Sequence, residues 1–206
     1  MTCSAQNIKR INGKVVYMNL PNKLTMLRII LIPIFVVLFE LSDIPNNMIW
    51  ALVVFCIAAI TDQLDGHLAR KNNQVTSFGK LADPLADKLL TISALICFVE
   101  ADFAYLPGWT VIVIIARELI VTGIRMIALT DNTVIAASIW GKAKTVSQLL
   151  TIIAIMLDMV LKDFDIEIFE IGNVPILLIL VIIMVALTLI SGIDYVKKNW
   201  NLLNFK

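Results

Sequence analysis

Four aspartates lie within one short stretch of the chain that separates two strongly apolar segments. Asp62 and Asp65 are three residues apart, and Asp83 and Asp87 are four apart. On an α-helix either spacing places both carboxylates on one face, so two helices that face each other would bring four carboxylates together. Carboxylates that close need a cation between them, and their hard oxygen atoms suit Mg²⁺, Mn²⁺ or Ca²⁺. The pattern predicts a pair of divalent metals bridged by shared carboxylates, an arrangement that catalyses phosphoryl displacement.

The residues around these aspartates suit the binding of a phosphate group. Gly66, Ala69 and Gly79 are small, so a ligand can approach the backbone beside them closely. Arg70 can direct two N–H groups at phosphate oxygens. In a plainer interpretation, the aspartates only form ion pairs with the cations of a solvated loop, namely Arg70, Lys71, Lys80 and Lys88. The ordered spacing of the whole set favours the phosphate site.

A second group of charges lies inside an apolar run farther along the chain. Arg117 and Arg125 are eight residues apart, about 80° around a helix and ~12 Å along it, so both can border one cavity at two depths. Lys142 and Lys144 are two residues apart and cannot share a helix face, so at most one, preferably Lys142, is expected to reach that cavity. Such a cluster would bind an anion, and the phosphate of a phosphorylated alcohol is the economical candidate. Alternatively, Arg117 pairs with Glu118 or with an acid across the bundle, and Arg125 extends to the surface.

The composition indicates that a membrane protein carries these groups. Of 206 residues, 59% are hydrophobic and 16% are charged, whereas a soluble domain has about a quarter charged residues. Six apolar segments have the length of membrane-spanning helices, which need about 17–25 residues. These segments cover residues 24–41, 47–66, 85–101, 108–130, 143–162 and 173–196. We therefore predict an all-α, polytopic membrane protein with six transmembrane helices.

The distribution of Lys and Arg predicts the orientation of these helices, because cytoplasmic loops concentrate both residues. The loops that follow the first and third segments, ELSDIPNN and EADFAYLPG, contain acids and no Lys or Arg. Cations gather instead before the first segment, in the second and fourth loops, and in the C-terminal tail. Both termini and the aspartate-bearing stretch are therefore predicted to be cytoplasmic.

The aspartate-bearing stretch resembles the signature of the CDP-alcohol phosphotransferase family. In that signature D-x-x-D-G-x-x-A-R is followed, after eight residues, by G-x-x-x-D-x-x-x-D. Every defined position matches, at Asp62, Asp65, Gly66, Ala69, Arg70, Gly79, Asp83 and Asp87. The resemblance implies a helical membrane enzyme in which an alcohol hydroxyl attacks the phosphorus next to the lipid of a CDP-linked lipid, and CMP leaves.

The same resemblance implies roles for individual residues. The four aspartates would bind two divalent metal ions, Mg²⁺ or Mn²⁺, and Asp87 would also take the proton from the attacking hydroxyl. The positions that would contact the nucleotide are Asn22, Thr25, Gly66, Ala69, Arg70 and Gly79.

Two further segments indicate the acceptor. AREL-x-VTG-x-R, which contains Arg117 and Arg125, and GK-x-KT, which contains Lys142, resemble family members that use glycerol 3-phosphate. The predicted reaction transfers a phosphatidyl group from CDP-diacylglycerol to glycerol 3-phosphate in phospholipid biosynthesis, with these three cations on the acceptor phosphate. The alternatives within the same chemistry are inositol phosphate, or phosphatidylglycerol in cardiolipin synthesis. An ion-coupled transporter is the alternative of another class, because buried acids and arginines also form ion sites.

The chain is expected to form one membrane domain, residues 18–206, preceded by an extension, residues 1–17. The stretch MNLPNKLT resembles the start of family members, so translation is predicted to begin at Met18. The resemblance also implies a homodimer in the cell membrane, with its active site facing the cytoplasm. No nucleic-acid partner is expected.

Overall fold

The computed structural model describes the chain over residues 9–11, 14–16, 20–41, 43–72, 77–130, 138–166, 168–171 and 174–200. Within these segments, side chains are described over residues 24–41, 43–61, 86, 88–128, 138–166, 168–169 and 175–200.

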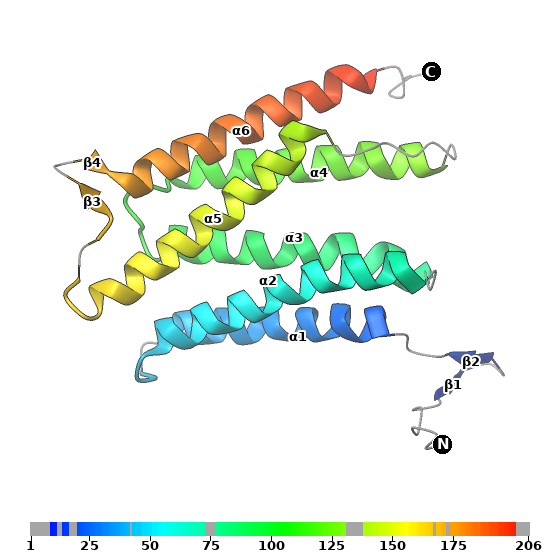
Figure 1. Ribbon diagram of the computed structural model, residues 1–206, viewed down its shortest axis with the longest axis horizontal. Coiled ribbons are helices and arrows are strands. Elements are labelled where there is room, and N and C mark those ends of the chain that lie inside the picture. Colours follow the sequence, from blue (N-terminus) through cyan, green and yellow to red (C-terminus); the bar gives the residue numbers. More distant parts are fainter. Residues whose placement is uncertain are drawn as a thin grey trace.

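The described residues form six long helices, as Figure 1 shows. Their bounds are α1 (Leu20–Glu40), α2 (Asn47–Asn72), α3 (Ser77–Glu100), α4 (Gly108–Thr130), α5 (Ile139–Lys162) and α6 (Ile176–Lys198). Two short antiparallel hairpins lie outside the bundle, one of β1 (Lys9–Ile11) with β2 (Lys14–Val16), the other of β3 (Glu170–Ile171) with β4 (Val174–Pro175). The prediction of a helical fold is therefore confirmed.

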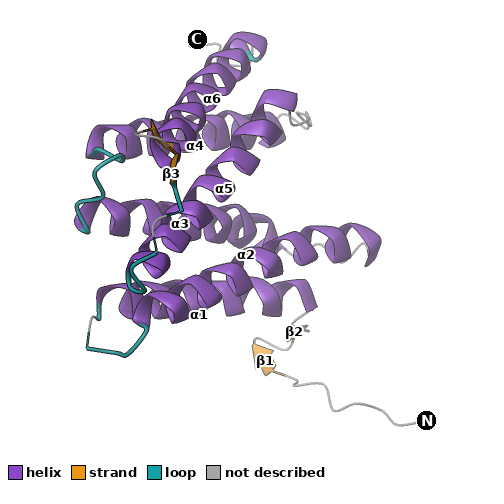
Figure 2. Ribbon diagram, turned by 60° about the vertical axis from the view of Figure 1, so that its left-hand side comes forward, coloured by secondary structure: helices purple, strands orange, loops and turns teal. Residues whose placement is uncertain are grey.

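The helices pack as two groups of three (Figures 1 and 2). In the first group α1 contacts both α2 and α3, and in the second α6 contacts both α4 and α5. Contacts of α3 with α4 and of α2 with α5 join the groups. Because α2 and α3 are neighbours that run in opposite directions, the end of α2 and the start of α3 lie at the same end of the bundle (Figure 1).

Aromatic side chains form the core of the first group. Phe35 of α1 lies 5.7 Å from Phe55 of α2, and Phe39 of α1 lies 5.9 Å from Phe98 of α3, both between ring centroids. All four side chains are buried. Tilted ring pairs of this kind each add about 0.5–1.5 kcal/mol beyond the burial of their area. This core occupies the halves of the three helices that lie away from the aspartate-bearing segments.

Helix α3 ends in a hydrogen-bonded turn that reverses the chain towards α4. Asp102 has a positive φ of 54°, and its N–H donates to the carbonyl of Val99 at 3.1 Å. The N–H of Phe103 donates to the carbonyl of Phe98 at 3.0 Å, and the two rings lie 6.5 Å apart. This pair of bonds and the accompanying hydrophobic contact are those of a Schellman motif, which satisfies the last carbonyls of a helix.

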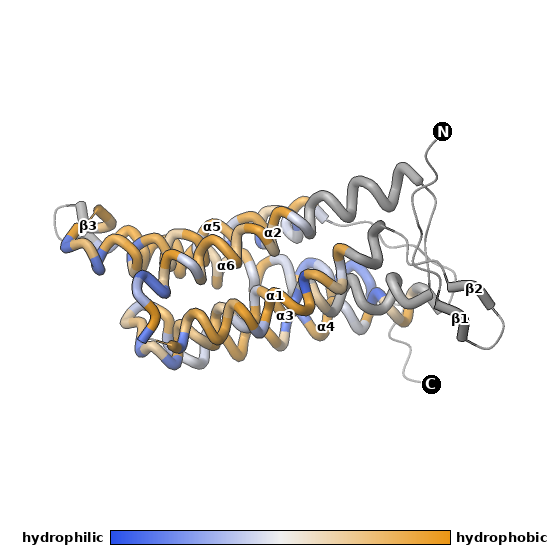
Figure 3. Tube along the Cα trace, turned by 90° about the horizontal axis from the view of Figure 1, so that it is seen from below, coloured by the Kyte–Doolittle hydropathy of each residue, from blue (hydrophilic) through white to orange (hydrophobic). Residues whose placement is uncertain are grey.

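The outer faces of the helices are apolar. Large side chains point away from the bundle, for example Ile112, which is 69% exposed, Ile182 at 57% and Ile30 at 54%. Figure 3 shows apolar residues along much of the helices, with hydrophilic residues at the turns and also within the helices near the middle of the bundle. A soluble monomer rarely exposes such a continuous apolar surface, whereas a protein surrounded by lipid does.

Two of the helices, α5 and α6, have both the length and the apolar composition of a membrane span, as judged over the described residues. Six spans were predicted, and the other four stay a prediction. Helix α4 differs because it carries three charged side chains, Arg117, Glu118 and Arg125. The helices therefore fit a membrane protein, and the charges of α4 require partners inside the bundle.

Candidate active site

All six helices contribute to one cavity of about 650 Å³. Arg28 of α1, Ala59 of α2 and Lys88 of α3 line it from one group of helices. Side chains of α4 and α5, together with Tyr195 of α6, line it from the other. The cavity therefore depends on the packing of the whole bundle.

The cavity is strongly cationic. Its lining includes a single carboxylate, that of Glu118, among the described residues. The cationic side chains that line it are Arg28, Lys88, Arg117, Arg125, Lys142 and Lys144. Among the described residues of the lining there are six cations and one acid, an excess of five formal positive charges. Such a cavity attracts a multiply charged anion, and arginines bind phosphate through two parallel N–H groups.

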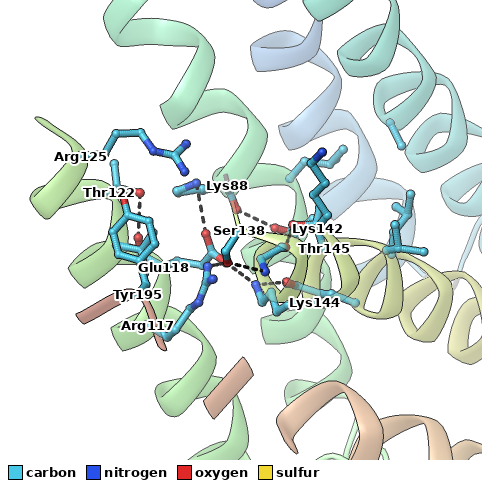
Figure 4. Close-up of a pocket in the computed structure, with 18 of the residues that line it drawn as sticks. Lys88, Arg117, Glu118, Thr122, Arg125, Ser138, Lys142, Lys144, Thr145 and Tyr195 are labelled. Atoms are coloured by element: carbon cyan, nitrogen blue, oxygen red, sulfur yellow. Dashed lines mark hydrogen bonds and ion pairs between the residues drawn. The ribbon is translucent and has the colours of Figure 1, made fainter. Parts of the chain in front are cut away.

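Glu118 connects three helices through its two carboxylate oxygens (Figure 4). Its Oε2 lies 3.1 Å from Nζ of Lys88 on α3. Its Oε1 lies 3.3 Å from Nη1 of Arg117 on α4 and accepts a hydrogen bond from Nζ of Lys144 on α5. Lys144 is 1% exposed and donates a second hydrogen bond to Oε1 of Gln148. The carboxylate therefore contacts three cations from three helices: Lys88 of α3, the adjacent Arg117 of α4, and Lys144 of α5.

Ser138 fixes the start of α5 and so the positions of its two lysines. The Ser138 backbone is extended, with φ −69° and ψ 157°, and its Oγ accepts a hydrogen bond from the N–H of Gly141 at 3.1 Å. This is the usual N-cap arrangement. Lys142 is exposed at the rim of the cavity, and Lys144 is buried, yet both line it. The expectation that at most one lysine reaches the cavity is therefore wrong, because the cavity follows α5 from the rim into the interior.

Arg117 passes between two glycines of other helices. A Cβ atom placed on Gly192 of α6 would lie 3.0 Å from Cγ of Arg117. A Cβ atom on Gly141 of α5 would lie 3.9 Å from Nη2. Nε of Arg117 is buried without a hydrogen-bond partner among the described residues. The missing side chain at position 192 thus leaves room for the arginine stem, and the guanidinium keeps donors that Glu118 does not use.

The structure brings together the three cations that the sequence assigned to an anion. Arg117, Arg125 and Lys142 all line the same cavity (Figure 4). The alternative, in which Arg117 pairs with an acid and Arg125 extends to the surface, is also consistent with the structure. Arg117 pairs with Glu118, and the Arg125 side chain is exposed. The two interpretations are compatible, because neither the ion pair nor the exposure removes these side chains from the cavity.

The aspartate-bearing segments belong to two neighbouring helices. Asp62 and Asp65 lie in the second half of α2, and Asp83 and Asp87 lie in the first half of α3. The side chains of all four are outside the described part of the chain, so their convergence stays a prediction. Lys88, which directly follows Asp87, lines the cationic cavity. The cavity therefore adjoins the aspartate-bearing part of α3.

The predicted nucleotide contacts lie in three helices. The residues in question are Asn22 and Thr25 in α1, Gly66, Ala69 and Arg70 in α2, and Gly79 in α3. Thr25 is fully buried, three residues before Arg28 of the cavity. The side-chain positions of the others are outside the described residues, and their nucleotide role stays a prediction.

Sequence reasoning missed part of the cavity. Arg28, Lys88 and Lys144 line it but were not assigned to the anion, and Glu118 was considered only as a partner of Arg117. A signal for Glu118 was present, because an acid inside a membrane-spanning segment needs a partner. Nothing in the sequence indicated that this partner would be a lysine 26 residues away.

A protein-family model described as CDP-alcohol phosphatidyltransferase matches residues 18–193. The match covers most of the chain and includes all four aspartates and the cations of the cavity. The chain belongs to this family. The cationic cavity and the aspartate-bearing stretch both lie within the part of the chain that matches this family.

Several relatives share one name, CDP-diacylglycerol–glycerol-3-phosphate 3-phosphatidyltransferase. The relative from Bacillus subtilis (strain 168) is 42% identical over 196 residues, which cover 90% of this chain and 97% of the relative. Relatives from Haemophilus influenzae and Escherichia coli (strain K12) are 43% and 39% identical over 136 residues. These alignments cover 65% of this chain, with 73% and 74% of the respective relative.

Proposed function

We propose that this chain is a CDP-diacylglycerol–glycerol-3-phosphate 3-phosphatidyltransferase. It transfers the phosphatidyl group of CDP-diacylglycerol to a hydroxyl of glycerol 3-phosphate, and the products are phosphatidylglycerophosphate and CMP. Membership of the family supports the nucleotide-linked donor, and the shared name of the relatives supports the acceptor. The observation that carries the choice of a phosphorylated acceptor is the cationic cavity.

Glycerol 3-phosphate matches the charge of this cavity. Its phosphate carries up to two negative charges, which six cations attract, whereas choline or ethanolamine carries a positive charge that they would repel. We assign Arg117, Arg125 and Lys142 to the acceptor phosphate, since they reach the cavity from two helices. Inositol phosphate would satisfy the same charges, and the name of the relatives favours glycerol 3-phosphate over it.

The aspartates suit a pair of divalent metal ions, Mg²⁺ or Mn²⁺. Two carboxylates come from each of two adjacent antiparallel helices, at spacings that place each pair on one helix face. A donor set made only of carboxylate oxygens fits hard divalent cations. We therefore assign Asp62, Asp65, Asp83 and Asp87 to the metals, which when bound would neutralise the pyrophosphate and the departing CMP.

The position of Asp87 supports its proposed role as the base. The phosphate and the reacting hydroxyl lie at opposite ends of glycerol 3-phosphate. A phosphate held by the cations of the cavity would leave that hydroxyl close to the aspartate-bearing segment, because Lys88 of the cavity and Asp87 lie in the same turn of α3. Asp87 then accepts the hydroxyl proton as the oxygen attacks phosphorus. We assign the nucleotide to the residues that match the family signature, Asn22, Thr25, Gly66, Ala69, Arg70 and Gly79.

We further propose that the six helices all span the cell membrane, with both termini and the active site on the cytoplasmic side. The apolar outer faces of the helices and the alternation of Lys and Arg between loops support this topology. The homodimer that the family resemblance implies is also proposed, and the mass of the protein in lipid nanodiscs would test it.

The proposed function is tested by measuring CMP release and lipid labelling by the purified protein in nanodiscs that contain CDP-diacylglycerol. Labelled glycerol 3-phosphate, inositol phosphate and phosphatidylglycerol are supplied in turn, each with and without EDTA. We expect labelled lipid and equimolar CMP with glycerol 3-phosphate alone, and loss of both with EDTA. Labelling by another acceptor would correct the substrate, and no CMP with any acceptor would favour a transporter.

A further inference from the structure

Glu118 is an unexpected residue in a site for a phosphate. Among the described residues it is the only carboxylate that lines the cavity, and by its charge alone it repels a phosphate. Two explanations are available. The carboxylate either only neutralises the buried ammonium of Lys144, or it also holds other cations where the phosphate binds.

The contacts of Glu118 go beyond the neutralisation of Lys144. One oxygen, Oε1, receives Lys144 and Arg117, and the other, Oε2, lies 3.1 Å from Lys88. The Lys88 and Arg117 side chains are 19% and 12% exposed, so both reach the cavity while they contact the carboxylate. A carboxylate has lone pairs for several donors, and an arginine has five N–H groups. Arg117 therefore keeps donors for a ligand after it pairs with Glu118.

We propose that Glu118 is a positioning residue for the acceptor phosphate. It ties α3 to α5 through α4 and holds Arg117 and Lys88 at the distances at which they bind the phosphate of the acceptor. This proposal rests on the proposed function, because it names the residue that organises the acceptor site of that reaction.

Replacement of Glu118 by glutamine separates charge from position. Glu118→Gln keeps the shape and removes the negative charge, so by electrostatics alone it should tighten phosphate binding and lower the KM for glycerol 3-phosphate. Positioning predicts the opposite. We expect this KM to rise about 10- to 100-fold, as for the loss of hydrogen bonds to a charged group, with the KM for CDP-diacylglycerol nearly unchanged.

A second pair of variants isolates the role of Lys144. Lys144→Met removes the buried ammonium, and Glu118→Gln is then added to it. If neutralisation of Lys144 were the whole role of Glu118, the added substitution would leave the acceptor KM as it is in Lys144→Met. Positioning predicts a further rise, because Arg117 and Lys88 lose their common partner.

A matched control is available on α5. Asp158 is also a buried acid, 4% exposed, and its Oδ2 lies 2.9 Å from Nζ of Lys162, outside the lining of the cavity. Asp158→Asn should lower thermal stability without changing the acceptor KM. If Glu118→Gln does not fold, Glu118→Asp tests the positioning role instead. This variant keeps the negative charge but shortens the side chain by one methylene, which moves the carboxylate away from Arg117 and Lys88. A raised acceptor KM supports positioning.

These experiments distinguish a failure of the proposed function from a failure of the positioning role of Glu118. A wild-type protein that incorporates no glycerol 3-phosphate overturns the proposed function. A wild-type protein that does so, with an acceptor KM that is unchanged or lower in Glu118→Gln, overturns the positioning role alone.

Discussion

The side chain of Arg117 shows how single residues shape this site. Its guanidinium pairs with Glu118, its stem lies against the space left by Gly192, and its Nε is buried without a partner among the described residues. An arginine suits this place because its planar fork can bind a carboxylate on one side and a phosphate on the other. A lysine at this position would offer three donors on a single atom in place of the planar fork.

Asp87 is the residue whose chemistry can be tested most directly. Asp87→Asn should reduce CMP release about 100-fold or more, since a general base contributes at least that factor and the same carboxylate is assigned to a metal. Binding of CDP-diacylglycerol should persist, which a labelled-lipid binding assay measures. The exposed Asp43 of the turn before α2 provides the control, because Asp43→Asn should leave both measurements unchanged. Undiminished CMP release by Asp87→Asn would remove Asp87 from the catalytic role.

At the level of the elements, α6 supports the site without placing a charge in it. Tyr195 lines the cavity from its last turns, and Gly192 lets α6 approach the Arg117 stem on α4. The cap at Ser138 plays a comparable part for α5, because it determines where the helix starts and hence where its lysines point. Elements outside the signature motif therefore control the geometry of the cavity that we propose as the acceptor site.

Gly192→Ala tests this contribution of α6. The new Cβ would lie 3.0 Å from Cγ of Arg117, so the arginine stem must move by a few tenths of an ångström. An off-rotamer stem costs about 0.5–1.5 kcal/mol. We expect the KM for glycerol 3-phosphate to rise about 2- to 10-fold, by the same free energy, with little change for CDP-diacylglycerol.

The control for this variant lies on α4. A Cβ on Gly123 would meet nothing within 4 Å, so Gly123→Ala should leave the acceptor KM unchanged and slightly raise thermal stability, since alanine is the better helix former. Equal kinetics of the two alanine variants would show that Arg117 does not depend on the glycine of α6.

In the molecule as a whole, apolar and charged side chains occupy different places. Apolar side chains cover the outside, and most of the charges inside the described part of the bundle gather in one cavity next to the aspartate-bearing segments, with Asp158 as an exception. A charge inside a membrane is costly unless it is paired or faces water. The ion pairs of Glu118 and the open cavity meet both conditions.

The topology can be tested by labelling single cysteines in whole cells. With the native cysteines replaced, Asp43→Cys and Asp102→Cys should react with a membrane-impermeant maleimide, since both lie in loops predicted to face away from the cytoplasm. Lys198→Cys at the end of α6 should react only after lysis. Labelling of Lys198→Cys in intact cells would reverse the proposed orientation.

Much of the fold and part of the site could be predicted from the sequence, because these features depend on short spacings. The six helices follow from long apolar runs, and the aspartates are recognised by intervals of three and four residues within helices. The same motif indicated the family, and the match of the family model over residues 18–193 shows it. Likewise, Arg117 and Arg125 were predicted to share a cavity from their interval of eight residues on one helix.

Contacts between helices that are far apart in the sequence could not be predicted from such spacings. The bond of Glu118 to Lys144 joins residues 26 positions apart, and the approach of Gly192 to Arg117 joins α6 to α4. Periodicity shows which face of a helix is polar, but it does not show which helices meet or how deeply they pack. Which cations surround the cavity, and which carboxylate contacts them there, is therefore decided by tertiary packing.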